Sequence, residues 1–146
     1  MKKLIILILL VIIGAGAWYG YMKFTGKNPD LADRKPDFTM DASSLISAFD
    51  KDTAAAGRQY VGKLLQVTGT VSKLDTSGVI SLGKAGDMSS VQCTMDHRHP
   101  IDYTKYKEGQ NISIKGICSG SNSEEMLGEK LGTNVQLNFC VIANNQ

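Results

Sequence analysis

Apolar residues form one uninterrupted run near the start of the chain and recur at short intervals over the rest. The run begins at Leu4 and ends at Met22, holds no charged side chain, and is flanked by Lys3 and Lys23. A helix rises about 1.5 Å per residue, so a run of this length spans the roughly 30 Å hydrocarbon core of a membrane. The pattern predicts a transmembrane signal-anchor over residues 1–24.

A cleaved signal peptide is the alternative, because the apolar run leads into the small residues 14–17, where cleavage near Ala17 fits the small-x-small pattern. In that case the body is secreted or periplasmic. Trp18 and Tyr19 follow, and such rings favour the headgroup level of a membrane-spanning helix. The N-terminal lysines favour an N-terminus inside the cell, so we expect the body on the extracytoplasmic side.

The spacing of apolar residues turns helical after a short polar stretch. Residues 25–37 include two of the three prolines and little to bury, which predicts a spacer before a domain over 38–146. Asp41 then offers an N-cap, and apolar residues recur at helical spacing from Leu45 to Phe49. Gly57 follows three alanines and suits the stop of this single amphipathic helix.

From Val61 onward the period falls to about two, which is typical of strands. Leu65, Val67 and Val71 alternate with polar residues, and Gly69 stands where a bulge or bend is expected. Further strands are predicted over 79–82, 91–95, 111–117 and 135–142, with a short helix over 103–107. The chain is thus expected to be mainly β. Five strands with a helix between the third and fourth follow the order of a five-stranded OB-fold barrel.

Several segments resemble the tRNA-anti-like family of bacterial OB-fold proteins. They are Lys35-Pro36-Asp37-Phe38, Tyr60-Val61-Gly62-Lys63, Val67-Thr68-Gly69-Thr70-Val71, Val91-Gln92-Cys93-Thr94, Lys115-Gly116-Ile117-Cys118-Ser119-Gly120 and Asn138-Phe139-Cys140-Val141. The resemblance covers about residues 35 to 142. It implies an OB-fold behind a leader, anchor or lipoprotein signal. This chain departs from the family by a long insert between Gly120 and Val135.

Three cysteines in a chain with an export signal make a disulfide plausible. The fourth and fifth strands of an OB-fold are neighbours, which favours Cys118 with Cys140. Cys93 alternates with apolar residues and is expected to point into the barrel as a small buried hydrophobe. The alternative to this disulfide is that all three cysteines are reduced, buried thiols. The weak point of the predicted disulfide is the position of Cys140. It is expected on the side of its strand opposite to the apolar face made by Leu137 and Phe139.

Neither metal binding nor catalysis has a convincing motif. Cys93, His97 and His99 are the nearest approach to a zinc or nucleophile–base set, but no CxxC pair or third orienting residue accompanies them. We therefore expect no cofactor and no enzymatic activity.

The charge balance disfavours nucleic-acid binding. Four of the 16 basic residues lie in or beside the apolar run, which leaves 12 against 14 acidic residues in the body. A protein that binds through phosphates normally shows a basic excess and aromatic platforms on its strands.

The insert at 121–134 is a possible binding loop. We expect one or two acidic helical turns, with an apolar side and an acidic side, or else a solvated excursion without a partner. The residues concerned are Glu124, Glu125, Met126, Leu127, Glu129 and Leu131.

The sequence therefore predicts a membrane-tethered OB-fold binding module of the bacterial cell envelope, whose ligand is an envelope protein or a small molecule. An OB-fold that binds single-stranded or tRNA-like nucleic acid is the alternative.

Overall fold

The computed structural model describes residues 12–16, 18–19, 30–75, 77–126 and 129–143. It divides into two compact units, residues 1–30 and 31–146. In the first unit, residues 12–16 and 18–19 are helical, and most of the anchor predicted from Leu4 to Met22 lies outside the described residues. Within the part that is described, no helix has both the length and the apolar character needed to cross a membrane.

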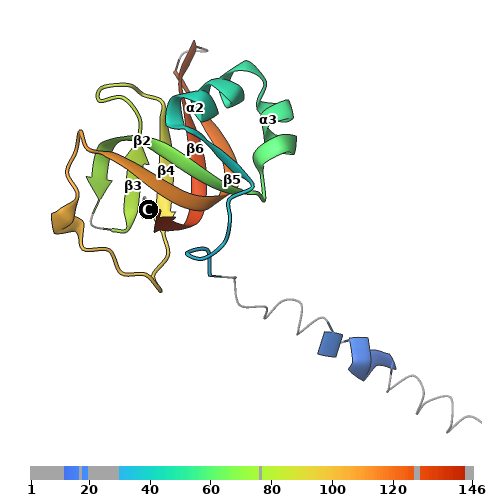
Figure 1. The fold of residues 1–146 in the computed structure, drawn as a ribbon. Coiled ribbons are helices and arrows are strands. Elements are labelled where there is room, and N and C mark those ends of the chain that lie inside the picture. Colours follow the sequence, from blue (N-terminus) through green and yellow to red (C-terminus); the bar gives the residue numbers. More distant parts are fainter. Residues whose placement is uncertain (1–11, 17, 20–29, 76, 127–128, 144–146) are drawn as a thin grey trace, which may run out of the picture. The chain divides into compact units, whose positions relative to one another are not determined.

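Five strands close the second unit into a barrel (Figure 1). They are β2 (Leu64–Asp75), β3 (Val79–Leu82), β4 (Ser90–Met95), β5 (Asn111–Met126) and β6 (Glu129–Ile142). Their order is β2-β3-β4-β6-β5, and β5 returns to pair with β2. β4 and β6 run parallel, and the other barrel pairs are antiparallel. This closed order confirms the predicted five-stranded OB-fold barrel.

The core follows the predicted alternation along β2. Leu65, Val67 and Val71 are fully buried. Of the bulge or bend expected at Gly69, a bulge is ruled out, since β2 pairs with β5 without a shift from Leu64 to Thr70. The irregularity lies instead between Val71 and Lys73, where β2 changes partner to β3.

Two helices replace the single helix predicted after Asp41. α2 (Ala42–Lys51) and α3 (Thr53–Tyr60) are separated by Asp52, which adopts an extended conformation and accepts a hydrogen bond from the Ala55 N–H at 2.8 Å. An aspartate stabilises a helix start better than a helix interior, so Asp52 begins a second helix. Gly57, expected to end the helix, lies inside α3.

The first of these helices packs on the barrel. The apolar side of α2, formed by Ala42, Leu45 and Phe49, is buried in the same cluster as the barrel interior, and α2 contacts β1, β2, β4 and β6. Between β4 and β5, where a helix was predicted over 103–107, the chain makes only a 3₁₀ turn, η1 (Tyr103–Lys105).

The segment before α2 is attached to the barrel. β1 (Phe38–Asp41), which the sequence did not predict, pairs in parallel with β2. The Asp37 N–H donates to the Leu64 carbonyl at 2.7 Å, and the Asp37 carboxylate accepts from the Leu64 N–H at 2.9 Å. Leu31 is fully buried against Leu64 and Val141. The last part of the predicted spacer, residues 31–37, therefore belongs to the folded unit.

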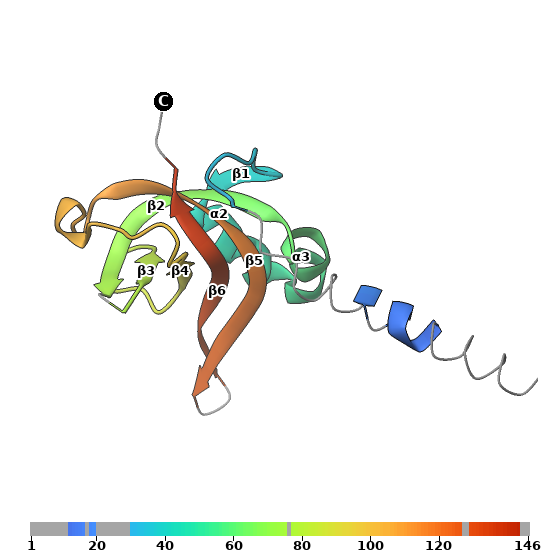
Figure 2. The ribbon, with the colours of Figure 1, turned by 90° about the horizontal axis from the view of Figure 1, so that it is seen from below.

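The insert at 121–134 is a β-hairpin, so the helical turns predicted there are wrong. β5 continues to Met126 and β6 starts at Glu129, with Ser121 opposite Val135 and Met126 opposite Glu129. Figure 2 shows this hairpin extending beyond the barrel. Glu124, Glu125, Met126, Glu129 and Leu131 are strand residues, and Leu127 lies outside the described residues. The two strands leave the barrel already paired, so each satisfies the backbone hydrogen-bonding groups of the other. This pairing outweighs the local preference of the residues for a helix.

We expect Gly69→Ala to destabilise the barrel. A Cβ at Gly69 would lie 2.8 Å from the Ala42 Cβ and 3.3 Å from the Leu82 Cβ, so α2 has to move away from the strand. Overpacking of this kind costs roughly 1–3 kcal/mol, measurable as the free energy of unfolding in urea. Gly57→Ala is the control, because a Cβ there meets nothing within 4 Å. It should stabilise α3 by roughly 0.5–1 kcal/mol. A Gly69→Ala variant as stable as the native chain would contradict the close contact.

Candidate functional site

The outward side chains of β3, β4 and β6 form an uncharged surface, which we call the polar face. Its central row is Ser81, Gln92 and Gln136, which stand opposite one another in register. Ser90 donates to the Asn134 side-chain oxygen at 2.9 Å in the next row. The polar face consists of Ser81, Ser90, Gln92, Thr94, Gln136 and Asn138, together with Asn134, which is only 7% exposed. Every member carries an amide or a hydroxyl group, so the surface offers both donors and acceptors without a net charge.

An apolar side chain, Met88, lies at one end of the polar face. The β3–β4 loop places Met88 against the hairpin, where a Cβ at Gly132 would lie 2.6 Å from the Met88 carbonyl oxygen. The Thr133 N–H donates to the Ser89 hydroxyl at 3.1 Å, which holds the loop on β6. Met88 is 58% exposed. Large apolar side chains left accessible beside a hydrogen-bonding surface suit ligand contact.

Phe139 lies toward the other end, in a bulge of β6. Leu137 pairs with Cys93 and Cys140 pairs with Met95, so β6 has one residue more than β4 over this stretch. Phe139 takes up the extra residue with φ 54°, and it is the only non-glycine residue with a positive φ among those described. The residue is 38% exposed. The bulge therefore turns an aromatic side chain toward solvent beside Thr94.

This bulge overturns the alternation predicted for β6. Leu137 and Phe139 were expected on one face and Cys140 on the other. Instead Cys140 is fully buried in the barrel core, and Phe139 is partly exposed. A bulge shifts the side-chain alternation by one position. The three apolar residues at alternate positions in the sequence indicate a regular strand and give no sign of the bulge.

The conformation of Phe139 is unfavourable in itself. A left-handed backbone costs an ordinary residue roughly 1–2 kcal/mol, and a half-exposed ring recovers only part of this by burial. Residues kept in such conformations cluster at binding and catalytic sites. Phe139 is the residue that sequence reasoning missed.

The charged pair next to the bulge is internally neutralised. Asp96 follows β4, is 6% exposed, and donates its N–H to the Cys140 carbonyl at 2.9 Å. Its carboxylate accepts hydrogen bonds from the Arg98 Nε at 3.0 and 2.9 Å and forms an ion pair with the same guanidinium. These hydrogen bonds from Arg98 lower the pKa of Asp96 to about 2. The charge of Arg98 is therefore balanced locally.

A cleft of about 570 Å³ lies on another side of the barrel, between α2, the middle of β2 and the β3–β4 loop. Its lining mixes Asp41, Asp87 and Lys84 with serines and backbone. Asp50 in this lining accepts a hydrogen bond from the Thr133 hydroxyl. Among the described residues no group of three or more His, Cys, Asp or Glu is placed to hold a metal.

The three cysteines are buried and free in the structure. Cys93 points into the core as predicted, whereas His97 is exposed in the following loop, so the residues considered for zinc or nucleophilic chemistry do not converge. Cys118 stands opposite Leu137 of β6, Cys140 stands opposite Met95 of β4, and the Cys93 thiol donates to the Val91 carbonyl oxygen at 3.8 Å. Both members of the predicted pair, Cys118 and Cys140, are free thiols here, so the pairing stays a prediction. Burial raises the pKa of Cys118 and of Cys140, which disfavours thiolate reactivity.

Fold and surface together define a small OB-fold protein with an uncharged outer face. The family model of tRNA_anti-like proteins matches residues 1–129, and the chain belongs to this family. No curated protein matches the chain. A solved structure described as OBody NL8 bound to hen egg-white lysozyme is similar at 16% sequence identity and a TM-score of 0.34, covering 57% of this chain and 98% of that one.

Backbone strain at Phe139 is tested by comparing two truncations. Phe139→Ala and Phe139→Gly both remove the ring, but only glycine is free of the left-handed penalty. We expect the glycine variant to be more stable than the alanine variant by about 1 kcal/mol in urea unfolding. At Gln136, where φ is not positive, the same pair should show the opposite order, because glycine weakens a regular strand. The same order at both positions would contradict the strain.

Asp96 should make stability depend on acid pH. Its pKa in the folded chain, about 2, lies below the usual value near 4, so the stabilisation is complete above pH ~4 and is lost as the pH falls toward 2. Asp96→Asn should lower the free energy of unfolding by roughly 1–3 kcal/mol at pH 6, and the difference from the native chain should shrink at pH 2. Replacing the exposed Glu108 by Gln provides the control. A difference that does not change with pH would show that the ion pair is not responsible.

Proposed function

We propose that this protein is a membrane-tethered OB-fold binding module of the bacterial cell envelope, and that its polar face binds an uncharged polar surface of a protein or small molecule. The observation that carries the proposal is the polar face itself. Seven amide and hydroxyl side chains lie on three neighbouring strands, five of them in register, with exposed Phe139 toward one end and exposed Met88 at the other.

The position of the polar face in the barrel supports this function. β3 and β4 are the second and third strands of the barrel, and OB-folds use the face of these two strands for ligands. Amide side chains fixed on strands discriminate by hydrogen-bond geometry, because a ligand that leaves them unpaired loses affinity. Aromatic and methionine side chains beside such groups supply the apolar contact that dominates many binding energies.

Nucleic acid is the less favoured ligand. Single-stranded nucleic acids are bound by cations along the backbone and by aromatic rings that stack with bases. β3 and β4 carry no aromatic residue, and Arg98, near the polar face, is paired with Asp96. Phe139 offers a single stacking platform. The body as a whole has 12 basic and 14 acidic residues.

The tether and the location belong to the proposal as well. They rest on the apolar run from Leu4 to Met22 and on the lysines before it. Protease added to intact spheroplasts should digest the folded unit while leaving cytoplasmic proteins whole. Protection of the folded unit until the membrane is broken would contradict the extracytoplasmic location.

Photo-crosslinking in cells tests the binding surface. A benzophenone amino acid is placed at Gln92 or Gln136 on the polar face, and at the exposed Arg58 on α3 as the matched control. We expect specific adducts from the first two positions only. Adding Phe139→Gly should reduce their yield about 5- to 10-fold, because loss of an interface aromatic commonly costs more than about 1 kcal/mol.

The chemistry of the adducts decides between the two functions. Adducts that resist nuclease and are degraded by protease, or that have the mass of a small molecule, support the proposal. Adducts removed by nuclease favour the nucleic-acid alternative. Equal labelling from Arg58 would show that the polar face is not the binding surface.

A further inference from the structure

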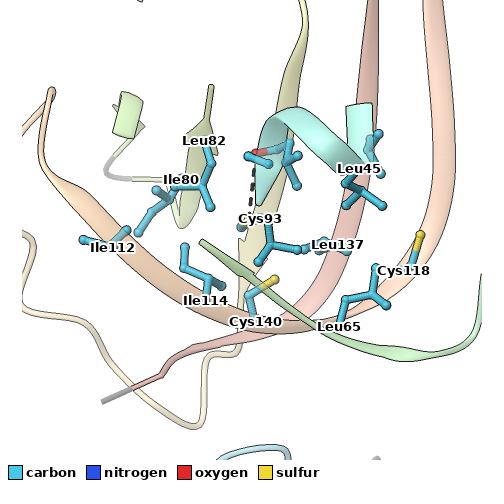
Figure 3. Packing of buried hydrophobic residues seen from close by; sticks show 14 of the residues in the cluster. Leu45, Leu65, Ile80, Leu82, Cys93, Ile112, Ile114, Cys118, Leu137 and Cys140 are labelled. Carbon is cyan, nitrogen blue, oxygen red and sulfur yellow. Dashed lines mark hydrogen bonds between the residues drawn. The ribbon is translucent and has the colours of Figure 1, made fainter. Parts of the chain in front are cut away.

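The strands that carry the polar face have a closely packed inner side. Ile80 of β3, Cys93 of β4 and Leu137 of β6 stand opposite one another in register, and all three are fully buried. Figure 3 shows these side chains among the core residues. Successive side chains of a strand point to opposite faces, so the next row, which includes Gln92 and Gln136, is turned outward. The packed inner side thus holds the outer row in place, as a preorganised binding surface requires.

Two amides in this outer row are available for hydrogen bonds. In the described part of the chain, the side-chain amides of Gln92 and Gln136 form no hydrogen bond with another residue, although both residues are partly buried. The outer side of β2 and β5 is different. There Gln66 donates to the Ser113 hydroxyl at 3.2 Å, and the same hydroxyl lies 3.1 Å from that of Thr68. Polar groups satisfy one another on that side, whereas the two amides of the polar face can pair with a ligand.

The order of polar and apolar groups on the polar face favours a small molecule over a protein. Protein interfaces place their apolar anchors at the centre and their polar groups at the rim. Here the central row holds only amide and hydroxyl groups, and the exposed apolar side chains, Met88 and Phe139, lie toward opposite ends. An extended peptide cannot add to these strands either, because β3, β4 and β6 each pair on both sides.

The absence of charge narrows the class of small molecule. The strand segments 79–82, 90–95 and 134–142 contain no charged residue. An acidic ligand would lose hydration here without gaining an ion pair, which disfavours nucleic acids and acidic sugars alike. A neutral sugar matches the surface, since each of its hydroxyls donates and accepts hydrogen bonds, as an amide side chain does. The C–H groups on one side of a sugar ring can also pack against an aromatic ring.

We propose that the polar face binds a neutral oligosaccharide. The inference rests on the proposed function, because it names the ligand of the same surface. The amides of Gln92 and Gln136 exchange hydrogen bonds with sugar hydroxyls, and the Phe139 ring packs against the C–H side of one sugar. From Ser90 to Thr94 the face runs about 14 Å along β4, at about 3.4 Å per residue, so it offers room for a chain of sugars.

The first test measures binding of the purified full-length chain to immobilised oligosaccharides. The neutral probes are chains of glucose, mannose or N-acetylglucosamine, and the acidic probes are chains of galacturonic acid. A detergent without a sugar headgroup is used, so that the detergent cannot compete for the site. We expect binding to at least one neutral probe, with an affinity that is nearly the same at about 0.05 and 0.2 M salt, because no ion pair forms. Binding to no neutral probe, or to the acidic probes alone, overturns the inference.

Variants locate the site on the polar face. Gln92→Met and Gln136→Met keep the length of the side chain but remove its donors and its acceptor, so each should weaken binding about 2- to 10-fold. Phe139→Gly should weaken it about 5- to 10-fold. Gln66→Met is the matched control, because Gln66 lies on the outer side of β2 and bonds to β5. Unfolding in urea checks that each variant is folded. Native affinity in both Gln92→Met and Gln136→Met, or an equal loss in Gln66→Met, contradicts binding at this face.

Crosslinking in cells separates this inference from the proposed function. The benzophenone amino acid at Gln92 or Gln136 should give adducts whose added mass is that of sugars and is removed by glycosidases. Adducts with a second protein, together with no binding to the neutral probes, overturn the oligosaccharide and leave the proposed function standing. If neither position gives a specific adduct and no neutral probe binds, both proposals fail.

Discussion

One extra residue in β6 determines much of the molecule. β6 pairs in parallel with β4 and antiparallel with β5, and over residues 137–141 it is longer than both by one residue. Phe139 absorbs the difference with a left-handed backbone. As a result Cys140 turns into the core, its carbonyl accepts the Asp96 N–H, and an aromatic ring turns out beside the polar face. The packing of the core, the position of the charged pair and the candidate site therefore all depend on this one extra residue in β6.

The sequence predicted those parts of the fold whose side chains alternate regularly. All five barrel strands and the inward position of Cys93 followed from a period of two, because burial on one side of a strand selects that period. The same reasoning failed at Phe139, since an ordinary residue in a left-handed bulge leaves no mark in the pattern. The error carried over to Cys140, which was expected on the outer face of β6 and lies instead in the barrel core.

Other differences arise from contacts between segments distant in sequence. The apolar and acidic residues of the insert suggested helical turns, yet pairing of the two arms of the hairpin decides their conformation. Gly69 looked like a bulge, but its hydrogen atom makes room for Ala42 at the start of α2. A close approach between backbones is a property of the packed structure, so a lone glycine does not reveal which element comes near. The polar face likewise became visible only when the order of β3, β4 and β6 was known.

The buried core and the proposed binding surface meet at adjacent residues. Cys140 directly follows Phe139, is fully buried in the barrel, and accepts the Asp96 N–H at its carbonyl, so β4 holds the end of the strained turn. A left-handed residue persists only where its surroundings hold it in place, and the burial of Cys140 and its hydrogen bond to Asp96 provide such a constraint. An aromatic ring held in one position loses less entropy when it binds a ligand. The buried cysteine thus serves recognition as well as packing, which accounts for a core cysteine placed immediately after an exposed aromatic residue.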